Sequence, residues 1–331
     1  MLFDPAANLI GAEDPQLGLR IIAGDVAVGQ VCCDPGAFAD VTTLVRPDAG
    51  APAAALLLDP RVRALLRVVW PSTVPHARLV WGSRVAAQVG RHRHLDDLVP
   101  AVVGDVLGVP EPVLHRVVAQ CRTAGRFEAD AVARAAVPMA LLHAATAEVV
   151  RTADSGQPDT VLEELLFWRG LGRERVTLDE IAALMTALVA AAWDATTALL
   201  ARPAGAAGGG EPEVIGWLRV MRETVVLGGA QLPAGSRCLL VVDALEPADR
   251  PVRPALHALR WLAPGAPGGA GATFAGLVAE AVRASGHEKD LRGGFPSPAL
   301  PGSGSGDRRL ASRPFSLSAQ LSSSWALPHV S

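Results

Sequence analysis

The chain has 331 residues, half of them hydrophobic, and a formal net charge of −3 from 30 basic and 33 acidic residues. This length allows one large domain or two modest ones, with ample apolar surface for a core. The nearly balanced charge argues against a broad nucleic-acid surface, which needs clustered lysines and arginines. Tyrosine is absent and aromatic residues are few, which argues against stacking platforms for bases.

Neither the N-terminus nor the apolar runs point to export or to a membrane. Residues 1–12 lack the basic segment and following apolar run of a signal peptide. The longest apolar run, residues 181–193, is too short to cross a bilayer. We therefore expect a cytoplasmic protein without membrane or nucleic-acid partners.

The four cysteines do not have the spacing of a metal site. Cys32 and Cys33 are adjacent, which suits neither an ordinary disulfide nor a zinc knuckle, and Cys121 and Cys238 stand alone. We expect buried, reduced thiols and no bound metal.

The first 200 residues contain mixed structure followed by helices. Residues 1–60 carry turn signals at 34–36 and 46–48, and the pattern from about residue 61 to 200 is mostly helical. The spacing of apolar residues predicts helices over residues 95–107, 112–121, 128–152 and 160–168. Gly108-Val109-Pro110 ends the first of these.

The clearest predicted element is a helix over residues 177–200. Thr177 and Glu180 have the spacing of a capping box, in which each side chain accepts a hydrogen bond from an orphan backbone donor. The residues that follow are apolar on every face until Asp194. A helix of this kind belongs in the centre of a protein.

The C-terminal part changes character several times. Residues 203–212 read as a Gly/Ala linker and 213–223 as a short helix, while 225–229 and 237–242 suggest strands of a small hairpin. A further helix is predicted over residues 274–284. Periodicity is lost near the end, so we expect a folded domain over residues 1–290 and a disordered tail over 291–331.

Four segments occur in the order found in bacterial cytochromes P-450. Residues 75–79, Pro-His-Ala-Arg-Leu, resemble the P-x-H-x-R-L-R stretch that begins the family's C helix, and residues 97–110 resemble its DLV … LGVP stretch. Residues 192–197, Ala-Trp-Asp-Ala-Thr-Thr, resemble the A-G-x-[DE]-T-T motif of the central helix. Residues 228–235 resemble the G-x-x-I-P-A-G hairpin. The resemblance implies a mainly α, P-450-like helical fold with a small β hairpin or sheet region, truncated relative to the family.

The resemblance also locates the family's haem positions, and most of them have lost their chemistry here. His76 is retained, but Val80 stands where the family places a second propionate-binding arginine. Gly216 replaces the glutamate of the E-x-x-R signature that ends at Arg219. The best counterpart of the F-G-x-G-x-H-x-C-x-G ligand loop is residues 264–271, with Gly271 at the thiolate position.

Two groups of polar residues carry open alternatives. Aligning Thr196 and Thr197 with the family's threonine pair places Asp194 one residue early, about 100° round the helix. These three residues are either a vestigial oxygen-activating site, or the point where the helix meets a cavity, or helix residues whose hydroxyls bond to neighbouring carbonyls. His76 is either a ligand contact or an ordinary surface histidine.

The lost positions predict that the chain binds no haem and has no catalytic residue. The resemblance then implies a pseudoenzyme, similar to actinobacterial homologues without the cysteine that activate a glycosyltransferase in polyketide or other natural-product biosynthesis. The alternative is an enzyme, either a P-450-type monooxygenase with atypical haem binding or a haem-free catalyst in the same pocket. A decayed gene product, with a frameshifted tail, is a third interpretation.

Overall fold

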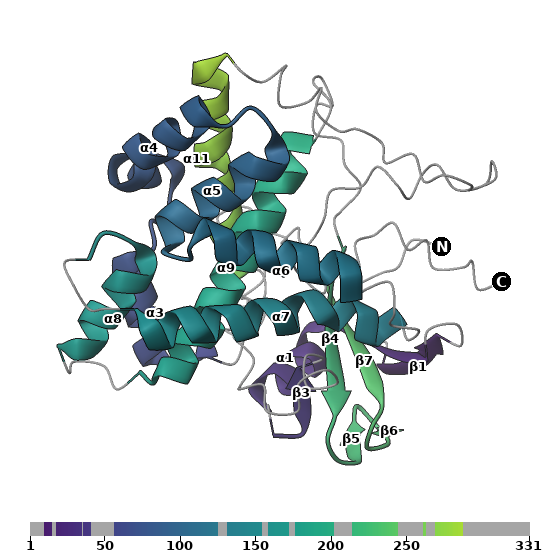
Figure 1. Cartoon of the computed structure of the whole chain (residues 1–331). Coiled ribbons are helices and arrows are strands. Elements are labelled where there is room, and N and C mark those ends of the chain that lie inside the picture. The colour runs from purple at the N-terminus through teal and green to yellow at the C-terminus, as the bar shows by residue number, and fades with distance from the viewer. Residues whose placement is uncertain are drawn as a thin grey trace, which may run out of the picture.

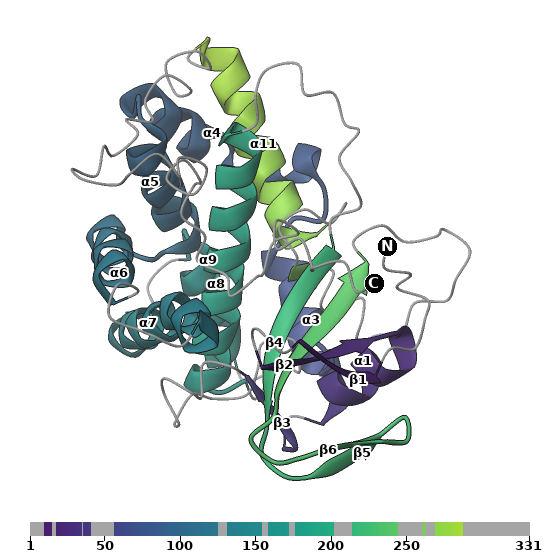
Figure 2. The same cartoon turned by 90° about the vertical axis from the view of Figure 1, so that its right-hand side faces the viewer.

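The computed structural model describes residues 10–14, 18–34, 36–40, 56–124, 131–153, 158–171, 176–201, 214–243, 261–262 and 269–286. Helices make up most of this part, and the strands gather at one end of it (Figures 1 and 2). The predicted class, mainly α with a small sheet region, is confirmed. The predicted linker at 203–212 and the predicted tail at 291–331 lie outside the described residues.

The helices follow the predicted order closely. They are α1 (Asp25–Cys33), α3 (Pro60–Val69), α4 (Val74–Arg91), α5 (Leu95–Leu107), α6 (Glu111–Ala124), α7 (Ala131–Thr152), α8 (Val161–Gly170), α9 (Leu178–Ala201) and α11 (Ala270–Ser285). α5 ends at Gly108, which adopts a left-handed conformation with φ of 83° that glycine enters without strain. The predicted stop after residue 107 is therefore confirmed.

The central helix α9 begins at the predicted capping box. The backbone N–H of Thr177 donates to Glu180 Oε2 at 2.7 Å, and that of Glu180 donates to Thr177 Oγ1 at 3.1 Å. Among the described residues, α9 is the one helix long and apolar enough to cross a membrane. Since 89% of that stretch is buried within the protein, α9 is a core helix.

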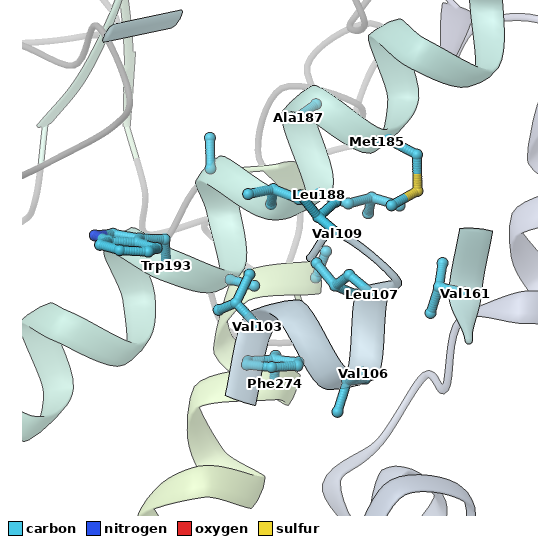
Figure 3. Packing of buried hydrophobic residues seen from close by; sticks show 14 of the residues in the cluster. Val103, Val106, Leu107, Val109, Val161, Met185, Ala187, Leu188, Trp193 and Phe274 are labelled. Atoms are coloured by element: carbon cyan, nitrogen blue, oxygen red, sulfur yellow. The ribbon is translucent and has the colours of Figure 1, made fainter. Parts of the chain in front are cut away.

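The main core forms where α5, α8, α9 and α11 meet. Val103 and Leu107 of α5, Met185 and Leu188 of α9, and Phe274 of α11 belong to one buried cluster (Figure 3). Burying an aliphatic or aromatic side chain of this size stabilises the fold by roughly 1.5–3 kcal/mol each. The apolar faces that the sequence pattern predicts therefore converge on α9.

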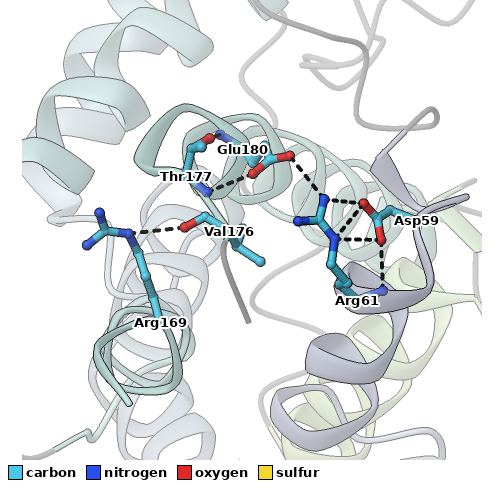
Figure 4. Close-up of polar contacts among 6 residues, drawn as sticks. All are labelled: Asp59, Arg61, Arg169, Val176, Thr177 and Glu180. Carbon is cyan, nitrogen blue, oxygen red and sulfur yellow. Dashed lines mark hydrogen bonds and ion pairs between the residues drawn. The ribbon is translucent and has the colours of Figure 1, made fainter. Parts of the chain in front are cut away.

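A polar contact ties the start of α3 to the start of α9. Asp59, the N-cap of α3, accepts a hydrogen bond from the Arg61 backbone N–H at 2.8 Å and pairs with the Arg61 guanidinium. Arg61 also approaches Glu180 Oε1 at 4.0 Å, beside the capping box (Figure 4). Hydrogen bonds and charge from Arg61 lower the pKa of Asp59.

Five strands form one sheet in the order β1-β2-β7-β4-β3. They are β1 (Ile10–Asp14), β2 (Leu19–Ala23), β3 (Phe38–Asp40), β4 (Val214–Met221) and β7 (Arg237–Asp243). β2 and β7 are parallel, and the other pairs are antiparallel. α1 covers one face of this sheet with a second, smaller core.

Two sequence predictions in this region are wrong. Residues 214–221 form strand β4 instead of a helix, because seven consecutive pairings with β7 satisfy its backbone and its Val, Ile and Trp residues suit a sheet. The hairpin partner of β5 (Val225–Leu227) is β6 (Ala230–Leu232), whereas residues 237–243 join the larger sheet. Gly228 and Gly229, both at positive φ, make the tight turn between β5 and β6.

Candidate functional site

The first turn of α11 lies directly against the middle of α9. A Cβ atom added to Gly271 would lie 2.5 Å from the carbonyl oxygen of Ala191 and 2.9 Å from the Cβ of Ala195. Real Cβ atoms essentially never approach other heavy atoms this closely. Residue 271 therefore has to be glycine for the two helices to touch as they do.

This contact changes the interpretation of the ligand-loop segment. A cysteine side chain has no room at position 271. The family motif ends C-x-G, so the close approach at Gly271 suits its last glycine, and the cysteine position then falls on Gly269, the N-cap residue of α11. The sequence lacks a thiol at either position.

Two hydroxyl groups on the C-terminal half of α9 have no hydrogen-bond partner. Thr196 is fully buried and Thr197 is 7% exposed, and the Oγ1 atom of each is unpaired. The alternative in which these hydroxyls bond to neighbouring carbonyls is therefore wrong. Asp194 is also buried, at 7% exposure. An unpaired buried hydroxyl costs about 1–3 kcal/mol, so the packing of α9 leaves the hydroxyls of Thr196 and Thr197 unsatisfied.

The other hydroxyl of α9 provides a contrast within the same helix. Thr186 Oγ1 donates to the carbonyl of Ala182 at 2.7 Å and lies 2.7 Å from Thr146 Oγ1 of α7. His143 Nδ1 of α7 lies 3.2 Å from the same hydroxyl. The Thr186 hydroxyl is thus satisfied by a carbonyl of α9 and by side chains of α7, whereas the unpaired hydroxyls of Thr196 and Thr197 lie in the C-terminal half of the helix.

Aromatic side chains connect α4, α11 and the segment between α3 and α4. Trp81 of α4 stacks edge-on against Trp70 at 5.1 Å between ring centroids, and lies 6.1 Å from Phe274 of α11. Trp70 also contacts Trp261 at 6.1 Å. The indole N–H of Trp70, which is 4% exposed, has no partner. The sequence does not reveal this cluster, because its members are separated by up to 204 positions and carry no motif.

His76 and Val80, the residues matched to the family's C-helix stretch, lie on the exposed side of α4. His76 is exposed, and its backbone N–H donates to Thr73 Oγ1, the N-cap of α4, at 3.4 Å. Val80, one turn further on, is 47% exposed. The structure therefore supports the surface interpretation of His76 and gives it no side-chain partner among the described residues.

The E-x-x-R counterpart lies on a strand. Side chains three residues apart on a strand point to opposite faces, so position 216 on β4 cannot pair with Arg219 of the same strand as it would on a helix. Arg219 is 3% exposed, and its Nη1 donates to the carbonyl of Leu218 at 2.8 Å. It faces Cys238 of β7 across the sheet.

The cysteines are free, and three of the four are buried. Burial raises the pKa of Cys32, Cys121 and Cys238 to about 11, and the charge of Arg219 offsets part of this effect at Cys32. These thiols stay protonated at neutral pH and are poor ligands and nucleophiles. Cys33 is exposed, so the prediction of buried thiols is wrong for that residue.

The described residues do not fit haem as the family holds it. Residues 262–271 contain no cysteine, histidine or methionine, so the segment offers no axial ligand. Within the described part of the chain, no three His, Cys, Asp or Glu residues lie together in a group that could hold a metal ion.

Comparisons with known proteins return cytochromes P450 among solved structures. The structure of CYP164A2 from Mycobacterium smegmatis shares 20% identity, covering 94% of this chain and 91% of its own, with a TM-score of 0.47. P450epoK bound to epothilone D shares 20% identity over 85% and 86% of the two chains, with a TM-score of 0.48. CYP109E1 from Bacillus megaterium, in complex with testosterone, shares 16% identity over 84% and 86%, with a TM-score of 0.45.

No family model matches the chain, and no curated protein matches it. The matched structures belong to the family that the four sequence segments resemble. Identities of 20% or less say nothing about the substrate or partner of this chain.

Proposed function

We propose that the chain is a haem-less homologue of cytochrome P-450 that acts in the cytoplasm as a non-catalytic partner of a glycosyltransferase in natural-product biosynthesis. The observation that carries this proposal is the junction of α9 and α11. The scaffold helices are present and well packed there, but the segment before α11 contains no cysteine, histidine or methionine that could serve as an axial ligand. Retained packing without the ligand chemistry favours a role as a binding partner.

The physical role would be stabilisation of a labile enzyme. A protein that binds the folded state of its partner and not the unfolded state stabilises it by about 2.7 kcal/mol at a concentration 100 times the dissociation constant. This effect needs a complementary surface and no reactive group. It is therefore compatible with protonated buried thiols and with the absence of a metal group among the described residues.

Co-expression with any glycosyltransferase encoded beside the gene tests this proposal. We expect the two proteins to co-purify, and we expect the transferase to have a higher melting temperature and higher activity when the chain is present. An unrelated glycosyltransferase serves as the control and should gain neither. A neighbouring transferase that neither binds the chain nor changes in activity would refute the proposal.

Unpaired buried polar atoms favour a second candidate, an enzyme that acts in the pocket where cytochromes P-450 hold haem. Thr196 Oγ1, Thr197 Oγ1 and Trp70 Nε1 are buried groups of the kind that a bound ligand would satisfy. An absorption spectrum of protein purified with haem supplied separates the candidates. We expect no Soret band, whereas a Soret band that shifts with carbon monoxide after reduction would establish the monooxygenase alternative.

Replacing Thr196 by valine tests whether a ligand uses its hydroxyl. Valine has nearly the same shape, so the exchange should raise the free energy of unfolding by about 1 kcal/mol if nothing pairs with the hydroxyl. Thr186→Val is the matched control on the same helix, and it should destabilise because it removes two contacts at 2.7 Å. A destabilised Thr196→Val would instead show that the hydroxyl has a partner.

A further inference from the structure

A groove between α4 and α11 lies outside the junction of α9 and α11. The two helices lie side by side at the edge of the molecule in both views (Figures 1 and 2). They almost touch where Val74 meets Gly276, since a Cβ atom added to Gly276 would lie 2.8 Å from Cγ2 of Val74. Further along both helices, a space of about 530 Å³ opens between them. This volume is in the range of pockets that hold small molecules, about 300–1,000 Å³.

The walls of the groove are apolar and consist mostly of short side chains. The uncharged residues that line it are Gly82, Ala86, Leu277, Ala281 and Ala284. The small residues recur one turn apart on each helix, so they continue along both walls. Because glycine and alanine cannot fill the space between the helices, the groove has room for an unbranched alkyl chain that lies along them.

The charge of the groove comes from arginine. Glu280 is the one acidic residue among the 18 residues of α4 and the 16 residues of α11. Arg78 pairs with it across the two helices, with Nε 3.1 Å from Oε2 and a second contact from Nη2 to the same oxygen. Arg283 also lines the groove and forms no ion pair with any residue that the structure describes. Since Arg78 neutralises Glu280, the guanidinium of Arg283 gives the groove one uncompensated positive charge.

We propose that this groove binds a free amphipathic carboxylate, a small molecule with one acid group on an unbranched alkyl chain. The chain would lie against the glycine and alanine residues of the walls. The carboxylate would accept hydrogen bonds from the guanidinium of Arg283, whose planar donors can hold both oxygens at once. An apolar groove with one unpaired guanidinium at its side thus matches a ligand with one apolar arm and one negative charge. The inference does not depend on the proposed function, because this ligand requires no glycosyltransferase.

Isothermal titration calorimetry of the full chain with decanoate tests this site. We expect saturable binding, and we expect decanol, which has the same chain without the charge, to bind about 10-fold more weakly. Octanoate should bind about 4- to 15-fold more weakly than decanoate, because each methylene removed from water contributes about fourfold to affinity. Acetate, which has the charge without the chain, should give no measurable binding.

Substitutions locate the ligand in the groove. Arg283→Gln should weaken the binding of decanoate to the level of decanol and leave the binding of decanol unchanged. Ala86→Leu places a longer side chain in the groove and should weaken the binding of both ligands by about 10-fold, because it takes the place of buried methylenes. Ala87→Leu is the matched control, since Ala87 is an exposed residue of α4 that does not line the groove, and it should bind both ligands as the unchanged protein does.

Several results would overturn this inference. Residues 86 and 87 are both exposed, so both leucine variants should melt at the same temperature as the unchanged chain, and weaker binding would not reflect misfolding. If decanoate does not bind, no carboxylate site exists in the groove. If decanol binds as tightly as decanoate, or if Ala86→Leu binds decanoate as the unchanged protein does, the assignment to Arg283 or to the groove is wrong. None of these results affects the test of the proposed function, which measures binding to a glycosyltransferase.

Discussion

Replacing Gly271 by alanine probes the close contact between α11 and α9. The added Cβ would lie 2.5 Å from the carbonyl oxygen of Ala191, a backbone atom that cannot rotate away. Forcing one carbon into a well-packed interior costs about 1–3 kcal/mol. At about 2 °C per kcal/mol for a chain of this size, we expect the melting temperature to fall by about 2–6 °C.

Thermal and urea unfolding followed by circular dichroism would measure this effect. Gly90→Ala is the matched control, since Gly90 lies in α4 and a Cβ there meets nothing within 4 Å. That exchange should stabilise the protein by about 0.5–1 kcal/mol, because alanine loses less backbone entropy than glycine on folding. Alanine should therefore lower the stability of the protein at position 271 and raise it at position 90.

A second substitution identifies which contact causes the loss. Ala195→Gly removes the atom 2.9 Å from the added Cβ but leaves the closer carbonyl of Ala191 in place. The double variant with Gly271→Ala should therefore recover little of the lost stability. If Gly271→Ala is as stable as the unchanged protein, α11 does not pack on α9 at this position, and the reasoning about the ligand loop fails.

Three further predictions concern other parts of the chain. Thr177→Ala should lower the free energy of unfolding by about 0.5–2 kcal/mol in a urea titration, because it removes the N-cap of α9, and an unchanged midpoint would contradict the capping box. A thiol reagent at pH 7 should modify Cys33 quickly and the other three cysteines only after unfolding, and rapid modification of Cys33→Ser would contradict the burial of the others. Burial raises the pKa of Glu164, so its ionisation disfavours the folded state as the pH rises through that pKa. Glu164→Gln should consequently raise the melting temperature at pH 7 and change it little at pH 4, where the side chain is mostly protonated in both states.

The helices were predictable because their signals lie close together in the sequence. The capping boxes that begin α8 and α9 each involve residues three positions apart, and the structure forms both. The stop at Gly108 is also local, since it needs only a residue that tolerates a positive φ. The apolar pattern of residues 181–193 likewise indicated the central position of α9 before any neighbour was known.

Tertiary contacts decided the features that sequence patterns misjudged. β4 is a strand because β7, about 23 positions further on, supplies its hydrogen-bond partners, although the segment alone resembles a short helix. Gly271 and Ala191 are 80 positions apart, so only their contact shows that the glycine is required by packing. The unpaired hydroxyls of Thr196 and Thr197 are equally invisible in the sequence, because hydrogen-bond satisfaction depends on which elements surround α9.

The sequence by itself determined that residues 262–271 contain no cysteine, histidine or methionine, the side chains that could ligate a haem iron. The structure decided how the first turn of α11 packs, by placing Gly271 against the backbone of α9. The physical reason for this division is that the two kinds of interaction act over different separations along the chain. Residue identity and helix caps act over a few positions, whereas close packing and surface complementarity join residues that only the fold brings together.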